Sequence, residues 1–172
     1  MIEIVSAQSG AALQHFISLS QEYVAWMTVE IQRQYPELDL NTFISTRSYD
    51  DVRKKFPGEH VPPHGCLLVA MHEGRVCGCA GLARLTDTIC EIRTVFVRPD
   101  CRGLGVGKKL VEAIISQALG LGYSTMRLDT LRFMDSAQNL YRSLGFYDIE
   151  PYVEISADLR RYVCFFERRL LD

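Results

Sequence analysis

The sequence predicts an α/β fold: a single domain whose mixed central sheet has about six or seven strands and carries helices on both faces. The chain has 172 residues, 48% of them apolar, which is enough to bury one core. Short apolar runs alternate with stretches of helical periodicity. The strand–helix–strand unit over residues 88–130 requires a right-handed crossover and a parallel strand pair, whereas the remaining neighbouring strands are expected to be antiparallel.

The first third of the chain predicts a short strand followed by a long helix. Residues 2–5 form the strand, and Ser9 is placed to cap a helix whose apolar side chains recur every three or four residues. Pro36 ends this helix. Residues 37–56 are expected to be partly helical, and the proline-rich residues 57–65 to form a loop.

The rest of the chain predicts the sheet and two further helices. After the third of the strands near 66–72, 75–83 and 88–97, a glycine-rich turn opens an amphipathic helix that ends at Gly122. The expected elements that follow are a strand over 125–130, a helix over 134–144 and a last strand pair near 146–149 and 161–168.

The glycine-rich turn is the most informative segment. A buried strand (Val95–Val97) leaves at Arg98-Pro99, and glycines then stand at alternate positions, 103, 105 and 107, before the helix begins. Such a turn directs backbone N–H groups and the positive end of the helix at one point, which suits a phosphate group. Glycine permits the unusual φ values and a close approach of the backbone. Arg98, Arg102, Lys108 and Lys109 add positive charge around the turn.

Two common phosphate-binding motifs fit this turn poorly. A P-loop requires glycine where Arg102 stands and serine or threonine where Lys109 stands. A dinucleotide fingerprint requires G-x-G-x-x-G near the start of a βαβ unit, whereas the spacing here is G-x-G-x-G in mid-chain; Asp129 would be its ribose-binding acid. The pattern that fits is R-x-x-G-x-G, carried by Arg102, Gly105 and Gly107.

This pattern resembles the pyrophosphate loop of the GNAT family, the Gcn5-related N-acetyltransferases, which bind acetyl-CoA. The segment Ala137–Phe146 (AQNLYRSLGF) is similar to the family's A-x-x-L-Y-x-x-x-G-F, and Glu91–Pro99 resembles the strand before the loop. Together these segments cover roughly residues 66–147 in the family's order. One position departs from it: Met134 stands where many relatives carry an asparagine that helps to hold CoA.

The resemblance implies a GNAT fold and acetyl-CoA as co-substrate. It implies that the donor's pantetheine arm pairs with the backbone of Val95–Val97, as an extra strand added to a splayed sheet. The side chains and backbone expected to contact the donor are Val95, Phe96, Val97, Arg102, Gly103, Leu104, Gly105, Val106, Gly107, Lys108 and Tyr141.

The resemblance also assigns two catalytic candidates. Tyr141 is the candidate general acid, because a phenol is protonated at neutral pH and can donate to the departing CoA sulfur; the alternative is an aromatic side chain packed in the core. Glu91 is the candidate base, directly or through water, and its alternative is a carboxylate paired with Arg93. The alternation of side chains along the strand does not decide between these two roles of Glu91, because relatives have a β-bulge in this strand that switches the faces partway along. Backbone N–H near Val95 is expected to stabilise the oxyanion.

Several other residues are weaker candidates for a place in the site. Asp129 and Thr130 are expected near the thioester. Trp26 and Tyr23 are expected mainly to pack in the core, although the family's first helix also borders the acceptor, so that Tyr23, Met27 and Glu30 are candidates to face substrate.

The cysteines and histidines do not predict a metal site. The six cysteines have no C-x-x-C pair and fall mostly in apolar segments, so we expect reduced core thiols. Cys101, in the basic turn, is expected to be an exposed and somewhat activated thiol. His60 and His64 lack nearby partner ligands and are not expected to bind a metal ion.

Charge and hydropathy limit the classes of binding partner that we expect. A net charge of −2 argues against a general nucleic-acid binder. The absence of a long apolar run and of a signal-peptide pattern predicts a cytoplasmic protein without membrane contact. We expect a small-molecule amine as acceptor. A protein or peptide N-acetyltransferase, a non-catalytic acyl-CoA sensor and a different acyl donor stay open, as does a homodimer; a pocket roofed by residues 20–65 would favour the small molecule.

Overall fold

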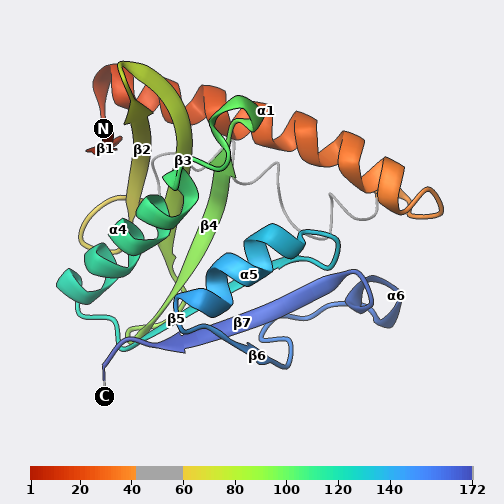
Figure 1. Ribbon diagram of the computed structural model, residues 1–172. Helices are drawn as coiled ribbons and strands as arrows, with labels where there is room; N and C mark the ends of the chain where they lie inside the picture. Colours follow the sequence, from red (N-terminus) through yellow and green to blue (C-terminus); the bar gives the residue numbers. More distant parts are fainter. Residues whose placement is uncertain (42–59, 172) are drawn as a thin grey trace.

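The computed structural model describes residues 1–41 and 60–171. It contains a seven-stranded mixed sheet in the order β1-β2-β3-β4-β5-β7-β6 (Figure 1). The predicted mixed α/β architecture is therefore confirmed. The strands are β1 (Ile2–Ser6), β2 (Cys66–His72), β3 (Arg75–Arg84), β4 (Ile89–Val97), β5 (Thr125–Leu131), β6 (Tyr147–Ile149) and β7 (Val163–Arg169).

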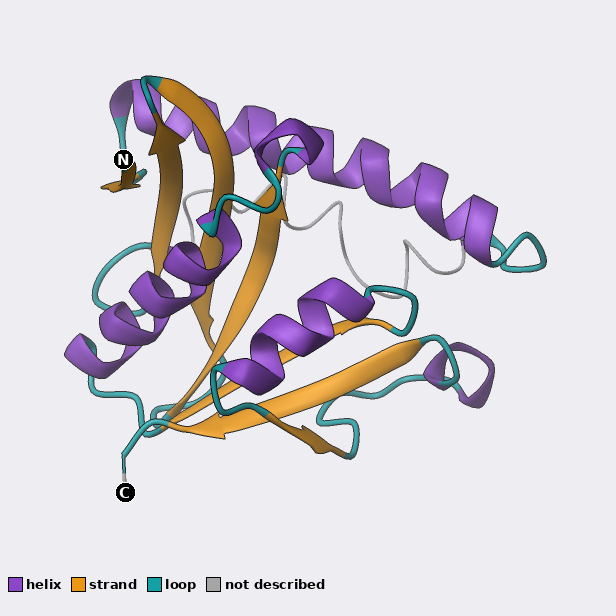
Figure 2. Cartoon of the chain, viewed as in Figure 1, coloured by secondary structure: helices purple, strands orange, loops and turns teal. Residues whose placement is uncertain are grey.

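Helices cover both faces of this sheet (Figure 2). The long helix α1 (Gly10–Gln34) packs on one face through Phe16 and Leu19, and α4 (Val106–Gly120) packs on the other through Leu110 and Ile114. Shorter helices are the 3₁₀ turn η2 (Pro99–Cys101), α5 (Asp135–Ser143) and α6 (Ala157–Arg160). The sheet is thus the middle layer of three, with a core on each side.

The predicted start of α1 is confirmed in position but not in mechanism. Ser9 occupies the N-cap with extended backbone, yet its side chain makes no capping hydrogen bond. The helix ends at Gln34, two residues before Pro36, which was expected to end it. Of the helical structure expected over 37–56, the part from residue 42 onward lies outside the described residues.

A β-bulge on β4 changes which face of the sheet the following side chains point to. Thr94 has a φ of +54°, rare for a residue other than glycine, and the β3–β4 register shifts beside it. Ile92 before the bulge and Val95 after it both face the α4 core, whereas Phe96 faces α1. The bulge expected in this strand is therefore present.

Glycine in β3 allows the bulged strand to lie close. A Cβ added to Gly78 would overlap the Phe96 carbonyl oxygen. This close backbone approach explains why glycine occupies the middle of an otherwise apolar strand.

The parallel pair β4–β5 joins the two halves of the sheet over only three residue pairs. Ile89, Cys90 and Glu91 pair with Thr125, Met126 and Arg127, while both strands continue well beyond them. The far half of β4 consequently has a ladder to β3 but none to β5. Its free edge opens between the two halves of the sheet.

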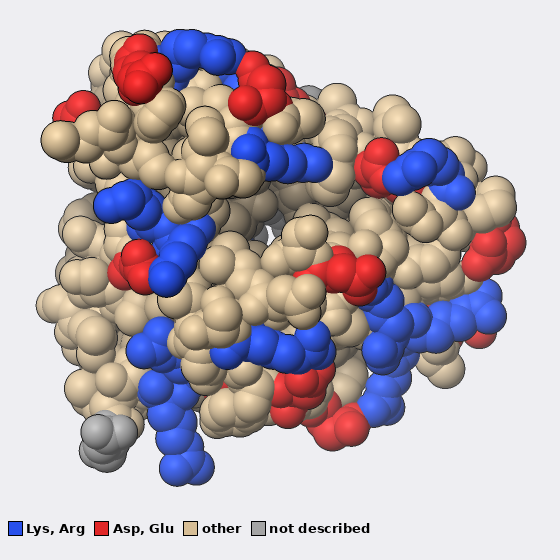
Figure 3. Space-filling view, viewed as in Figure 1, with Lys and Arg blue, Asp and Glu red and all other residues tan. Residues whose placement is uncertain are grey.

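Charges are interspersed on the surface. The face in Figure 3 shows Lys and Arg side chains interleaved with Asp and Glu, without a broad basic area among the residues drawn there in colour. Within residues 1–41 and 60–171, no helix combines the length and the apolar character needed to cross a bilayer.

Candidate active site

A cavity of about 670 Å³ lies where β4 and β5 separate. It is bounded by α1, the free part of β4, the glycine-rich turn and α5, and Figure 3 shows a hollow near the centre of the view where these elements meet. The predicted donor residues that line it are Val95, Phe96, Val97, Arg102, Gly103, Gly105, Val106, Gly107, Lys108 and Tyr141. The Leu104 side chain is exposed and does not line this cavity.

The glycine turn leaves room in front of the helix. Gly103 and Gly105 have φ values of +79° and +82°, and Gly105 is the N-cap of α4. A Cβ at either position would meet no described protein atom within 4 Å. Glycine is therefore required here by the backbone conformation, and the space around it is open for a ligand at the positive end of the helix.

Arg102 lies across the cavity wall. Its Nε donates to the Val97 carbonyl at 3.2 Å, and its guanidinium sits 4.8 Å from the centre of the Trp26 ring. Lys108 also lines the cavity and makes a long 3.9 Å contact to Glu112. These two cations are the ones that the turn presents to the cavity, because Lys109 does not line it.

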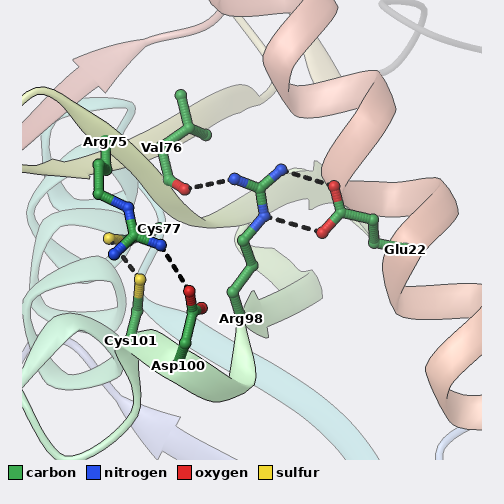
Figure 4. Close-up of polar contacts among 7 residues, drawn as sticks. All are labelled: Glu22, Arg75, Val76, Cys77, Arg98, Asp100 and Cys101. Carbon is green, nitrogen blue, oxygen red and sulfur yellow. Dashed lines mark hydrogen bonds and ion pairs between the residues drawn. The ribbon is translucent and has the colours of Figure 1, made fainter.

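Arg98, expected to add charge around the turn, faces the other way. Its guanidinium donates to both carboxylate oxygens of Glu22 on α1, at 2.8 and 2.6 Å, and to the Val76 carbonyl at 2.7 Å (Figure 4). The hydrogen bonds from Arg98 lower the pKa of the Glu22 carboxyl. Arg98 therefore ties α1 to the end of β4, and its predicted role as part of the phosphate-binding charge is wrong.

Cys101 is buried, contrary to the expectation of an exposed, activated thiol. The 3₁₀ turn folds it inward, so that its sulfur lies 2.6 Å from that of Cys77 (Figure 4). Burial raises its pKa to about 11, so the thiolate is disfavoured at neutral pH. All six cysteines are buried and unbridged, as predicted for core thiols.

Tyr141 combines packing with access to the cavity. It is 6% exposed, and its ring contacts Phe146 and Phe166 at centroid distances of 5.8 and 6.3 Å. Burial raises the pKa of its phenol, which therefore stays protonated at neutral pH. The hydroxyl group is thus kept as a hydrogen-bond donor beside the cavity.

Glu91 lies near the split between β4 and β5 but does not line the cavity. It is 8% exposed, accepts a 2.7 Å hydrogen bond from the Tyr152 hydroxyl and pairs with Arg93. The ion pair with Arg93, which was the alternative to a role for Glu91 as the base, is therefore present. Asp129 and Thr130, on β5 beyond the split, do line the cavity.

One face of α1 forms a wall that the sequence indicated only in part. Tyr23, Trp26, Glu30 and Arg33 all line the cavity, whereas Met27 is buried in the core. Tyr23 and Glu30 were expected as candidates to face substrate, and they line the cavity. Met27 was expected to do the same, and that expectation is wrong. Because positions three and four apart share a helix face, the spacing 23, 26, 30 and 33 is the signal that identifies Trp26 and Arg33.

The two histidines lie in different environments. His60 is buried, and burial with the nearby Arg93 lowers its pKa to about 4, so the imidazole is neutral at physiological pH. His64 is exposed, and its carbonyl accepts from the Tyr123 hydroxyl at 2.7 Å. In the described ranges no three potential ligands cluster to hold a metal ion.

Comparison with known proteins decides the family. The model of the acetyltransferase (GNAT) family matches residues 21–146, which include every residue that lines the cavity. The chain belongs to the GNAT family. An uncharacterized N-acetyltransferase of Schizosaccharomyces pombe is 40% identical over 111 residues, covering 63% of this chain and 68% of that protein.

The GNAT fold extends over the whole chain. A proposed acyl-CoA N-acyltransferase of Klebsiella pneumoniae superposes with a TM-score of 0.72 at 23% identity, covering 99% of both chains. A Bacillus subtilis acetyltransferase in complex with CoA has a TM-score of 0.57 at 20% identity, covering 73% of this chain and 86% of that one. Other curated relatives match over less of their length, such as 54% of an uncharacterized Escherichia coli N-acetyltransferase.

Family membership makes this chain an acetyltransferase with an acyl-CoA co-substrate and an amine acceptor. The residues present suit that donor, because open space lies at the N-terminus of α4 beside Arg102 and Lys108. Met134, at the position of the family's asparagine, lines the same cavity but provides no amide.

Proposed function

We propose that this protein transfers the acetyl group of acetyl-CoA to the amine of a small molecule, by direct attack in a ternary complex. The observation that carries the proposal is that one cavity gathers the glycine turn, the unpaired edge of β4 and Tyr141. No covalent enzyme intermediate is needed, because donor and acceptor can meet side by side in this space.

The donor would bind along the free edge of β4. Its pyrophosphate fits the N-terminus of α4, where N–H groups, Arg102 and Lys108 provide positive charge. Its pantetheine arm would pair with the backbone at Val95–Val97, which has no ladder to β5. Arg102 has to leave the Val97 carbonyl for this pairing to include that oxygen.

The chemistry follows from the groups placed there. The neutral amine attacks the thioester carbon, a C–N bond forms, and backbone N–H near Val95 stabilises the oxyanion. The C–S bond then breaks as the Tyr141 hydroxyl gives its proton to the sulfur. The amine's excess proton leaves through Glu91 or through water, and the phenolate recovers a proton from solvent. Because Glu91 lies outside the cavity wall, its part requires a water relay.

A small acceptor is supported by the size of the site and by its α1 wall. The cavity has a volume typical of small-ligand sites, which run from about 300 to 1,000 Å³. Residues 23–34 of α1 wall one side of it, within the segment expected to roof a closed pocket. The part of that segment from 42 to 59 lies outside the described residues.

Tyr141→Phe tests the proposal. It keeps the ring contacts and removes one hydroxyl, so we expect turnover to fall by roughly 10²–10³ with little change in CoA affinity. Initial rates of CoA release and calorimetric titration with CoA measure the two effects. Tyr147→Phe is the matched control, because Tyr147 is exposed on β6 and bonds Glu167. Wild-type turnover in Tyr141→Phe would remove this residue from the mechanism.

A further inference from the structure

The acceptor half of the cavity lies between α1 and the connection from β5 to α5. On one side the α1 face presents Tyr23, Trp26, Glu30 and Arg33, and on the other stand Phe133 and Met134. Trp26 touches Arg102 of the glycine turn at 4.8 Å, and all of these side chains come from α1 or the β5–α5 connection rather than from the turn itself. Their chemistry therefore bears on the acceptor, on the basis of the function proposed above.

The near wall of this half is aromatic. Tyr23 and Trp26 are stacked at 6.4 Å with an interplanar angle of 24°, and both contact Phe96, at 5.7 and 6.3 Å. All three rings line the cavity, and Tyr23 and Trp26 are only half-buried. Aromatic faces left partly uncovered in a cavity favour a flat apolar ligand.

The far wall continues this apolar character. Phe133 is half-buried, lines the cavity and packs against Tyr35 at a centroid distance of 5.7 Å. Met134 follows it and supplies a flexible, polarisable side chain. A ring-bearing acceptor would thus have apolar contacts on two sides.

The charges in this half suit a cation better than a carboxylate. Arg33 is the guanidinium that α1 offers to the cavity, and Glu30 accepts from its Nε and Nη2 at 3.2 and 2.6 Å. The carbonyl end of α1 lies beside it and carries partial negative charge. Among the described lining residues, the remaining cations, Arg102 and Lys108, belong to the donor turn. An acceptor carboxylate would have to share Arg33 with Glu30, which already accepts from its Nε and Nη2.

We infer that the acceptor is a primary amine on an aromatic or comparably bulky apolar body, without a carboxylate beside the amine. The rings of Trp26 and Phe133 would hold the body, and Glu30 together with the carbonyl end of α1 would attract the ammonium group before it loses its proton. Such arylalkylamines differ from free amino acids and from peptide N-termini, the acceptors that the same fold could otherwise serve.

A matched substrate panel tests this inference. With saturating acetyl-CoA, rates of CoA release are compared for phenethylamine, phenylalaninamide, phenylalanine and a hexapeptide with N-terminal alanine. We expect kcat/KM for phenethylamine to exceed that for phenylalanine by about tenfold or more. Equal or higher kcat/KM for phenylalanine or the hexapeptide would overturn the inference and leave acetyl transfer intact. Absence of acetylation of any amine by a protein that binds acetyl-CoA would overturn the proposed function as well.

Two variants test whether the residues of this half of the cavity determine the preference for the acceptor. Phe133→Ala should raise KM for phenethylamine by about tenfold, with CoA affinity unchanged; Val29→Ala, on the exposed side of α1, is the control. Glu30→Gln releases Arg33, so the preference for phenethylamine over phenylalanine should fall by about threefold or more. If Phe133→Ala leaves KM unaltered and Glu30→Gln leaves the preference unaltered, the assignment of this wall to the acceptor is wrong.

Discussion

Replacing Arg98 with alanine should destabilise the protein far more than removing a surface arginine. The side chain makes two hydrogen bonds to the Glu22 carboxylate and one to the Val76 carbonyl. Buried charge-assisted bonds contribute about 1.5–3 kcal/mol each, but partly exposed pairs contribute much less. Arg98 and Glu22 are 31% and 38% exposed, so we expect about 1 kcal/mol of coupling between them. The lost hydrogen bond to the Val76 carbonyl adds about 1 kcal/mol and brings the loss in Arg98→Ala to about 2 kcal/mol.

Thermal and urea unfolding of a double-mutant cycle measure this loss. For a chain of this size, 2 kcal/mol corresponds to a decrease in Tm of about 4–8 °C. The cycle combines Arg98→Ala with Glu22→Gln, and its coupling free energy isolates the pair. Arg75→Ala is the matched control, because Arg75 pairs with Asp100 at 2.5 Å in the same corner but both side chains are more than half exposed (Figure 4). It should leave Tm unchanged.

The pH dependence supplies a second readout. Arg98 lowers the pKa of Glu22 below its value of 4.5 in the unfolded chain. The stabilisation is therefore fully present above pH 4.5 and is lost as the pH falls through the lower pKa of the folded state. The coupling should be constant between pH 7 and pH 5.5 and should shrink below pH 4. A loss in Arg98→Ala no larger than in Arg75→Ala, or a coupling that persists at low pH, would refute the argument.

Three further substitutions test the site and its support. Gly105→Glu should abolish CoA binding, because it strains the positive-φ N-cap of α4 and places a negative side chain where the pyrophosphate would lie; calorimetry would show an unchanged affinity if the turn does not bind the donor. Gly78→Ala should lower the free energy of unfolding by about 1–3 kcal/mol through overlap with the Phe96 carbonyl, whereas Gly120→Ala, which meets no atom, should be neutral or stabilising in the same urea titration. Glu91→Gln should lower kcat/KM if Glu91 takes the proton, directly or through water; an effect found only in Asp129→Asn would transfer that role to Asp129.

The fold was largely predictable because its elements are encoded locally. Strand-length apolar runs and the helical spacing of the α1 and α4 segments predict their types from neighbouring residues alone. The two additional short helices, η2 and α6, lack such periodicity. Thr94 shows a different limit: its positive φ belongs to the bulge where the β3–β4 register shifts, and that bulge was expected from the family resemblance rather than from a residue pattern around Thr94.

The site was predictable where a motif defines it and less so where distant segments meet. The glycine turn and Tyr141 were found because both lie in contiguous motifs, and the structure brings them to one cavity. Arg98 was misassigned because its partner, Glu22, is 76 positions away in the chain. Cys101 was misassigned because the 3₁₀ turn, rather than the composition of the loop, decides that its sulfur points inward.

The contact between Arg102 and Trp26 gives the protein an optical reporter of its own site. Trp26 is the single tryptophan of the chain, so all indole emission comes from one ring in the cavity wall. If CoA binding draws Arg102 away from that ring, the emission intensity and wavelength should change, and an acceptor that contacts the ring should change them separately. Stopped-flow fluorescence of the unlabelled wild-type protein can therefore show which substrate enters first.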